Sequence, residues 1–201
     1  MTMRSARVLL AAAVLAACGA EPPVGTLARA ARDSASAAAG GRDTADSTSV
    51  PAAGVIVLAP DGLEIPSSGG APTRLAFGAP QVRVLADAGA MLGQPVEQGT
   101  QEECPAGELY YAQYGAGLHL VFQDSAFAGW SAGDGSPLRT AAGVGPGSTL
   151  GELRRAYPAA TVEETSLGME FAAGEMWGIV SDSSEAGRVE LLFAGTNCVF
   201  R

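Results

Sequence analysis

Residues 147–158 read GSTLGELRRAYP, and this stretch marks both ends of a short helix. Thr149 stands three residues before Glu152, which is the spacing of a capping box at a helix N-terminus. Pro158 cannot continue a helix, so it sets the end. The predicted apolar face of the helix consists of Leu150, Leu153 and Tyr157.

An earlier stretch has the same design. Pro80 suits the first turn of a helix, and Gly93 suits its C-terminal cap. The apolar stripe predicted between them consists of Val82, Leu85, Gly89 and Leu92. The sequence therefore predicts a second helix from Pro80 to Gly93.

Strand patterns follow each predicted helix. After the first helix they are Glu108–Tyr114, Leu118–Phe122 and Ala126–Trp130. After the second helix they are Met169–Ala172, Met176–Val180 and Arg188–Phe193. The predicted fold class is α+β, an antiparallel sheet with short helices packed on it.

Two features recur at nearly the same spacing. The 82/85 and 150/153 apolar pairs lie 68 positions apart, and the tripeptide at Phe127 recurs at Phe193, 66 positions later. This spacing suggests two helix-then-sheet repeats, although a tripeptide of common residues leaves the duplication open.

The composition excludes several function classes. The chain has 201 residues, with 21 acidic and 12 basic residues, and every basic residue is arginine. Without lysine there is no Walker-A loop and no Schiff-base chemistry, and one histidine cannot build a multi-histidine metal site. A net charge of −9 argues against nucleic acid as a partner. We expect no cofactor, no metal and no catalytic residue.

The N-terminus has the parts of a secretory signal. Residues 1–17 contain two arginines followed by an apolar run too short to span a bilayer. Leu15-Ala16-Ala17-Cys18 resembles the lipobox of bacterial lipoprotein precursors, which implies cleavage before Cys18 and lipidation of its sulfur. Gly19 follows, so the aspartate associated with inner-membrane retention is absent. An ordinary signal peptide is the alternative.

The resemblance implies a localisation and a domain plan. It places the mature protein in the cell envelope, anchored by lipid to the membrane, and favours the periplasmic face of the outer membrane. Residues 18–54 lack aromatic residues and are rich in alanine, serine and proline, so they form a predicted flexible tether. All twelve aromatic residues lie in the predicted globular domain, residues 55–201.

The layout resembles the small outer-membrane lipoproteins of the SmpA/OmlA type and the related tandem-repeat β-lactamase inhibitory protein fold. The resemblance rests on the lipobox, the helix start at 147–149 and the following antiparallel sheet. It implies a scaffold or protein-binding role without catalysis, and it transfers no binding residue to this chain.

Cys104 and Cys198 remain after Cys18 is lipidated. In an oxidising compartment a single pair predicts one structural disulfide, Cys104–Cys198. A redox pair, or two unpaired thiols, are the alternatives.

Several motifs have a chemical and a structural interpretation, and we favour the structural one. Residues 129–133 match the G-x-S-x-G nucleophile elbow, but His119 precedes them and no helix pattern follows. The glycine-rich loop 143–147 suits a phosphate, but Pro146 removes a backbone donor. Turn 182–187 lacks the ligand spacing of a calcium loop.

Side chains with binding or acid–base potential are also few. The adjacent carboxylates at 102–103 and 163–164 point to opposite strand faces, which predicts surface charge rather than a catalytic dyad. His119 lies opposite the face that carries Leu118 and Leu120. Five aromatic residues are either core or recognition residues: Tyr110, Tyr111, Tyr114, Trp130 and Trp177.

These observations favour a lipid-anchored envelope protein that acts as a non-catalytic binding or scaffold module for a protein partner in the periplasm. A carboxylate-dependent cell-wall or envelope enzyme is the alternative, and a purely structural lipoprotein is the third interpretation.

Overall fold

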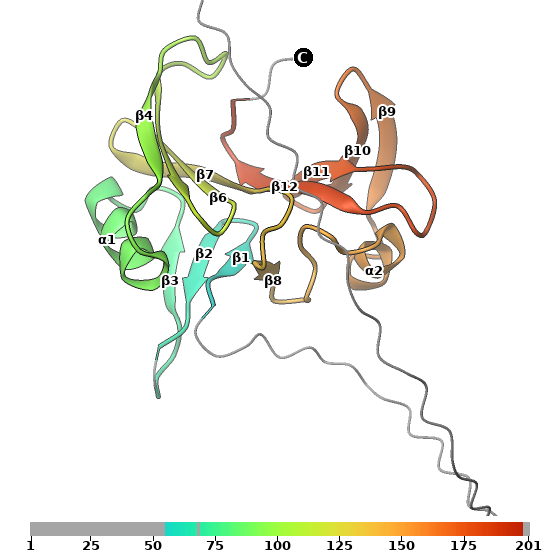
Figure 1. Cartoon of the computed structure of the whole chain (residues 1–201), viewed down its shortest axis with the longest axis horizontal. Helices are drawn as coiled ribbons and strands as arrows, with labels where there is room; N and C mark the ends of the chain where they lie inside the picture. The colour runs from blue at the N-terminus through green and yellow to red at the C-terminus, as the bar shows by residue number, and fades with distance from the viewer. Residues whose placement is uncertain (1–54, 68, 199–201) are drawn as a thin grey trace, which may run out of the picture. The chain divides into compact units, whose positions relative to one another are not determined.

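The computed structural model describes residues 55–67 and 69–198 (Figure 1). The predicted signal peptide, Cys18 and the predicted tether up to residue 54 lie outside the described residues. Within the part that is described, no helix is both long and apolar enough to cross a membrane.

Eight antiparallel strands form the large sheet. Its order is β4-β5-β6-β7-β12-β11-β10-β9, so β7 and β12 pair at the centre while β4 and β9 are the edges. The strands of the first half are β4 (Glu97–Gln101), β5 (Leu109–Tyr114), β6 (Leu118–Gln123) and β7 (Ala126–Ala132). Those of the second half are β9 (Thr161–Thr165), β10 (Gly168–Ala173), β11 (Met176–Val180) and β12 (Val189–Gly195).

A smaller sheet lies on one side of the large one (Figure 1). Its order is β3-β2-β1-β8, and only the β1–β8 pairing is parallel. Its strands are β1 (Val57–Ala59), β2 (Gly62–Ile65), β3 (Thr73–Ala76) and β8 (Arg139–Thr140). The sequence analysis predicted none of these four strands, nor β4 and β9.

The first helix, α1 (Gln81–Leu92), begins and ends where the sequence predicts, between Pro80 and Gly93. Its predicted stripe is confirmed only in part, because Leu85 and Leu92 pack against the core. Val84 and Ala88 are the buried residues, and Val82 is 77% exposed. Pro80 forms a β-bridge with Ala126 of β7, and this backbone pairing sets the rotation of the helix. Val84 therefore faces the sheet.

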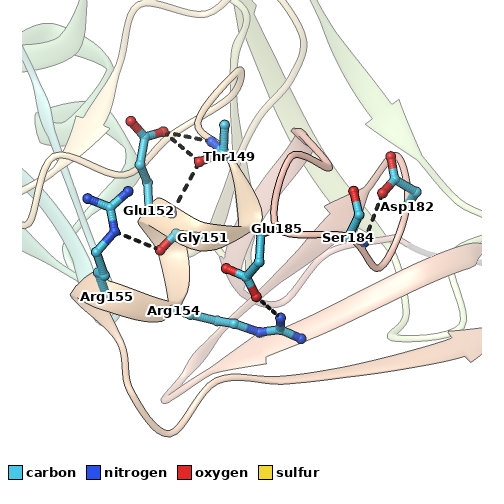
Figure 2. Close-up of polar contacts among 8 residues, drawn as sticks. All are labelled: Thr149, Gly151, Glu152, Arg154, Arg155, Asp182, Ser184 and Glu185. Atoms are coloured by element: carbon cyan, nitrogen blue, oxygen red, sulfur yellow. Dashed lines mark hydrogen bonds and ion pairs between the residues drawn. The ribbon is translucent and has the colours of Figure 1, made fainter.

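The second helix, α2 (Leu150–Ala156), has the predicted capping box (Figure 2). The Thr149 N–H donates to Glu152 Oε2 at 2.7 Å, and the Glu152 N–H donates to Thr149 Oγ1 at 3.2 Å. The first of these bonds is the main cause that lowers the pKa of Glu152. Leu150 and Leu153 are buried as predicted.

The core lies between the large sheet and the layer that the helices and the small sheet form (Figure 1). Leu118, Leu120 and Phe122 of β6 are buried in it, as the alternation predicts. Trp130 of β7 joins the layers, because its Nε1–H donates to the backbone oxygen of Ala59 in β1 at 2.9 Å. The predicted α+β class with an antiparallel sheet is confirmed in this coarse form, with sheet predominating over helix.

The structure does not support the predicted Cys104–Cys198 disulfide, because both residues are free thiols in it. A disulfide brings the two sulfur atoms to about 2 Å. Here Cys104 and Cys198 lie in one small apolar cluster with Leu109 and Val121. Burial first, and then the contact with Cys104, raise the pKa of Cys198 to about 11. The Cys198 thiol therefore stays protonated at neutral pH.

Candidate functional site

The face of the large sheet opposite the helices and the small sheet is called the open face here. Strand pairing aligns one residue from every strand across it. In spatial order, this cross-strand row consists of Glu97, Gln113, His119, Ser131, Phe193, Trp177, Ala172 and Thr161. The register thus brings residues 97 to 193 into one continuous surface.

The five aromatic residues singled out in the sequence divide between the two faces. Tyr114 and Trp130 are buried in the core, at 1% and 0% exposure, and Tyr110 packs against the same core. Tyr111 and Trp177 belong to the open face, and Trp177 is 38% exposed. Only these two therefore remain as candidate recognition residues.

A cavity of about 530 Å³ opens on this face, mainly over its first half. Its position on β4, β5, β6, β7 and β12 spans the seam between the two halves of the sheet. The residues that line it are Glu97, Thr100, Gln101, Tyr111, Gln113, His119, Val121, Ser131, Leu191, Phe193, Asn197 and Cys198. A volume of this size suits a small ligand or a side chain of a partner.

Glu97, Tyr111 and His119 form one contact group in this cavity. Tyr111 Oη donates to Glu97 Oε1 at 2.8 Å, and this hydrogen bond is the main cause that raises the pKa of Tyr111. The Tyr111 and His119 rings stack with centroids 6.1 Å apart and an interplanar angle of 11°. Burial lowers the pKa of His119, against the opposing effect of Glu97, so the neutral imidazole is favoured.

A glycine makes room for this arrangement. Gly99 lies directly opposite Tyr111 in the β4–β5 pair. A Cβ atom at Gly99 would lie 3.3 Å from Tyr111 Oη, closer than most Cβ contacts. The missing side chain lets Tyr111 lie across β4 and reach Glu97.

The segment after β12 turns over the open face and bounds the cavity. The Thr196 N–H donates to Ala128 O at 2.8 Å, and a Cβ atom at Gly129 would lie 2.0 Å from Thr196 O. Asn197 Nδ2 then donates to Ala194 O at 3.0 Å. Gly129 is thus required where the segment crosses the central strand.

A second aromatic contact occupies the other half of the face. Trp177 and Phe193 are cross-strand partners, and their rings stack with centroids 6.4 Å apart. Glu163 and Glu170 face each other nearby on β9 and β10, and they line a smaller cavity of about 210 Å³ with Trp177.

The arginines of the described residues all lie away from the open face. They belong to the small sheet, to the two helices or to the β11–β12 loop, as Arg74, Arg83, Arg139, Arg154, Arg155 and Arg188. Arg154 pairs with Glu185 beside α2 (Figure 2), and Arg188 donates to Gly147 O at 2.8 Å. None of these arginines is among the residues that line the two cavities of the open face.

The motifs with a chemical interpretation are structural where they are described. Ser131 lies within β7 rather than on a strand-to-helix turn, so residues 129–133 do not form a nucleophile elbow. In the 143–147 loop, the Gly145 N–H donates to Ser148 Oγ and the Gly147 N–H to Val189 O, which uses two of its donors internally. Residues 182–187 form the predicted turn between β11 and β12, where the Ser184 N–H donates to Asp182 Oδ1 (Figure 2).

The cross-strand row also brings together two side chains, His119 and Ser131, of types that serve in catalysis. His119 and Ser131 are cross-strand partners, but no hydrogen bond joins their side chains among the described contacts. Residues 55–67 and 69–198 contain no cluster of three or more residues that could hold a metal ion.

Sequence reasoning missed most of this surface. Glu97 and Gln113 were not predicted, because each is an ordinary residue in its own strand. Ser131 was considered only within the G-x-S-x-G match, and Phe193 only within the repeated tripeptide. Alternation along each strand indicated which residues share a face, but the row depends on the register of seven strand pairs. No protein-family model matches the chain, and neither curated proteins nor solved structures give a match.

Proposed function

We propose that the chain is a lipid-anchored protein of the cell envelope that binds a protein partner on its open face, without catalysis. The observation that carries the binding role is the cross-strand row, which exposes Trp177 and an open cavity on one continuous face. Aromatic side chains on such a surface are common anchors of protein interfaces. The lipobox at Cys18 supports the anchor and the location at the periplasmic face of the outer membrane.

The arrangement of the elements supports a duplicated architecture for this module. Each helix precedes four consecutive strands of the large sheet, and β7 and β12, the last strand of each set, pair at the centre. We propose that these are two helix-then-sheet repeats, of the kind implied by the resemblance to tandem-repeat inhibitory proteins. The open face would then be shared by both repeats.

Position-specific photocrosslinking in the native envelope tests the binding role. A photoreactive amino acid at Gln113 reports on the open face, and one at Val82, on the outer side of α1, is the matched control. We expect the same partner from Gln113 in repeated experiments and not from Val82. A partner captured from Val82 alone would place the interface elsewhere.

The anchor is tested separately. The Cys18→Ala variant should lose incorporation of radiolabelled palmitate and move from the membrane fraction to the soluble one. If the variant remains lipidated, the modified residue is not Cys18.

The enzyme alternative has one specific pair in its favour. Glu163 and Glu170 oppose each other in the smaller cavity beside Trp177, and Glu170 is 9% exposed. Hydrolysis of purified cell-wall glycan by the full chain, lost in Glu170→Gln but not in Glu175→Gln, would favour this alternative over the binding module.

A further inference from the structure

The cavity at Glu97 has the composition of a site for a cationic side chain. We propose that the partner inserts an arginine or lysine of a basic segment into this cavity, where the cation contacts Glu97 and the Tyr111–His119 ring pair. This inference rests on the proposed binding role and adds the chemistry of the partner.

Glu97 supplies the negative charge. One of its oxygens accepts the Tyr111 hydroxyl at 2.8 Å, and a carboxylate has about four acceptor positions in all, so it can still accept from a guanidinium or an ammonium group. The hydrogen bond from Tyr111 also holds the carboxylate in place on the edge strand. An oriented carboxylate matches the planar donor fork of arginine.

The rings supply the second contact. Tyr111 and His119 are nearly parallel and line the same cavity as Glu97. A guanidinium group stacks on flat aromatic surfaces and is attracted by their electron-rich faces. A neutral His119 imidazole presents such a surface without repelling the incoming cation.

The charge distribution selects a cation over an anion. Glu97 lies in the larger cavity and Glu163 and Glu170 in the smaller one, while the described arginines all belong to other surfaces. An anionic segment would be repelled by the negative charge of Glu97, whereas a basic segment is electrostatically complementary to it. The same complementarity speeds association with a basic partner.

The single histidine of the chain lets NMR follow peptide binding at the proposed site directly. Its imidazole protons produce one set of NMR signals in the full-length lipidated protein in detergent micelles, and His119 lines the proposed site. The probe is a short blocked peptide with one central arginine between glycine and serine residues. The same peptide with citrulline, which keeps the shape but removes the charge, is the matched control.

We expect the arginine peptide to shift the His119 signals saturably and the citrulline peptide to bind at least about tenfold more weakly. Glu97→Gln keeps an acceptor for Tyr111 but removes the charge, so it should weaken binding of the arginine peptide by a similar factor. Glu64→Gln, on the small sheet, should leave the dissociation constant within about twofold. Thermal unfolding of each variant checks that the fold is retained.

Equal binding of the arginine and citrulline peptides, or unchanged binding to Glu97→Gln, would overturn the cation site. The photocrosslink at Gln113 separates the two proposals. If it persists in Glu97→Gln while the arginine peptide fails to bind the wild type, the binding face stands and the cationic partner is wrong. If the arginine peptide binds as expected but no position on the open face captures a protein, the cation site stands and the protein-binding role fails.

Discussion

Replacing Trp130 by phenylalanine tests the contact that joins the two sheets. Trp130 is fully buried, and its Nε1–H donates to Ala59 O at 2.9 Å. Phenylalanine keeps an aromatic ring but removes the donor, so the buried oxygen of Ala59 loses this partner. Leaving a buried polar group without its hydrogen bond costs about 1–3 kcal/mol.

The smaller ring adds a packing cost. Phenylalanine leaves a space of roughly 40 Å³, and at about 24 cal/mol per Å³ this space costs about 1 kcal/mol. Together the two effects lower the free energy of unfolding by about 2–4 kcal/mol. For a folded unit of this size, that corresponds to a fall in Tm of roughly 6–12 °C.

Urea and thermal unfolding followed by far-UV circular dichroism measure this change. Trp177→Phe is the control, because Trp177 is 38% exposed and no hydrogen bond of its indole contributes to the interlayer contact. We expect the control to lose less than about 1 kcal/mol. A loss at Trp130 no larger than at Trp177 would refute the role of the indole as the link between the layers.

Three further changes have defined outcomes. Thr149→Ala removes the side-chain cap of α2 and should cost about 1 kcal/mol in urea unfolding, and no loss would contradict the capping box. Ser125→Gly relieves a left-handed residue (φ 61°) in the β6–β7 turn and should raise the free energy of unfolding by about 0.5–1 kcal/mol, whereas a decrease would exclude backbone strain there. Cys198 should react slowly with iodoacetamide until the pH nears 11, and rapid labelling at pH 8 would contradict its raised pKa. Folding raises the pKa of the Cys198 thiol from 9.0. The stability that this protonated thiol contributes is therefore complete below pH 9 and is lost as the pH rises toward 11.

Short sequence patterns predicted the helices and strands whose formation depends on contacts between residues close together in the chain. The capping box fixes α2 within a few residues, and the turn at 115–117 joins two strands that pair directly with each other. The small sheet gives no such signal, because its strands are two to four residues long. Its β1–β8 pairing joins Val57 to Arg139, which no local pattern can indicate.

The predicted disulfide is not supported, for a different reason. Two cysteines in an oxidising compartment are a valid basis for expecting a bond, and the fold does bring Cys104 and Cys198 together. Proximity in an apolar cluster is nevertheless less demanding than the distance and dihedral angle of a disulfide. The sequence indicated the neighbours but not their chemical state.

The candidate site was partly accessible to sequence reasoning. Residues on β5 alternate between faces, so Tyr111 had to lie opposite Tyr110 and Tyr114. Leu118 and Leu120 of the adjacent strand β6 indicate which face is the core. Extending this assignment to β5 needs the register of the β5–β6 pair, which the turn between the two strands restricts. Glu97 could not be found this way, because β4 carries no apolar pattern.

The repeated tripeptide shows how the two halves of the sheet diverge. Gly129 and Gly195 face each other at the central pair, yet Phe127 is buried in the core while Phe193 belongs to the open face. A register shift between Val121 and Phe122 explains the difference, because the extra residue turns Phe127 to the other side. The same tripeptide thus supplies a core residue in one half and an open-face residue in the other.

This divergence makes the open face asymmetric. The first half holds the polar cavity at Glu97, and the second half holds the stacked Trp177 and Phe193. Phe193 lines the cavity from the second half and stacks on Trp177, so the two features are continuous across the β7–β12 seam. A partner that places a cation beside Glu97 and an apolar group on Trp177 would use both halves of the sheet at once, which neither half alone could provide.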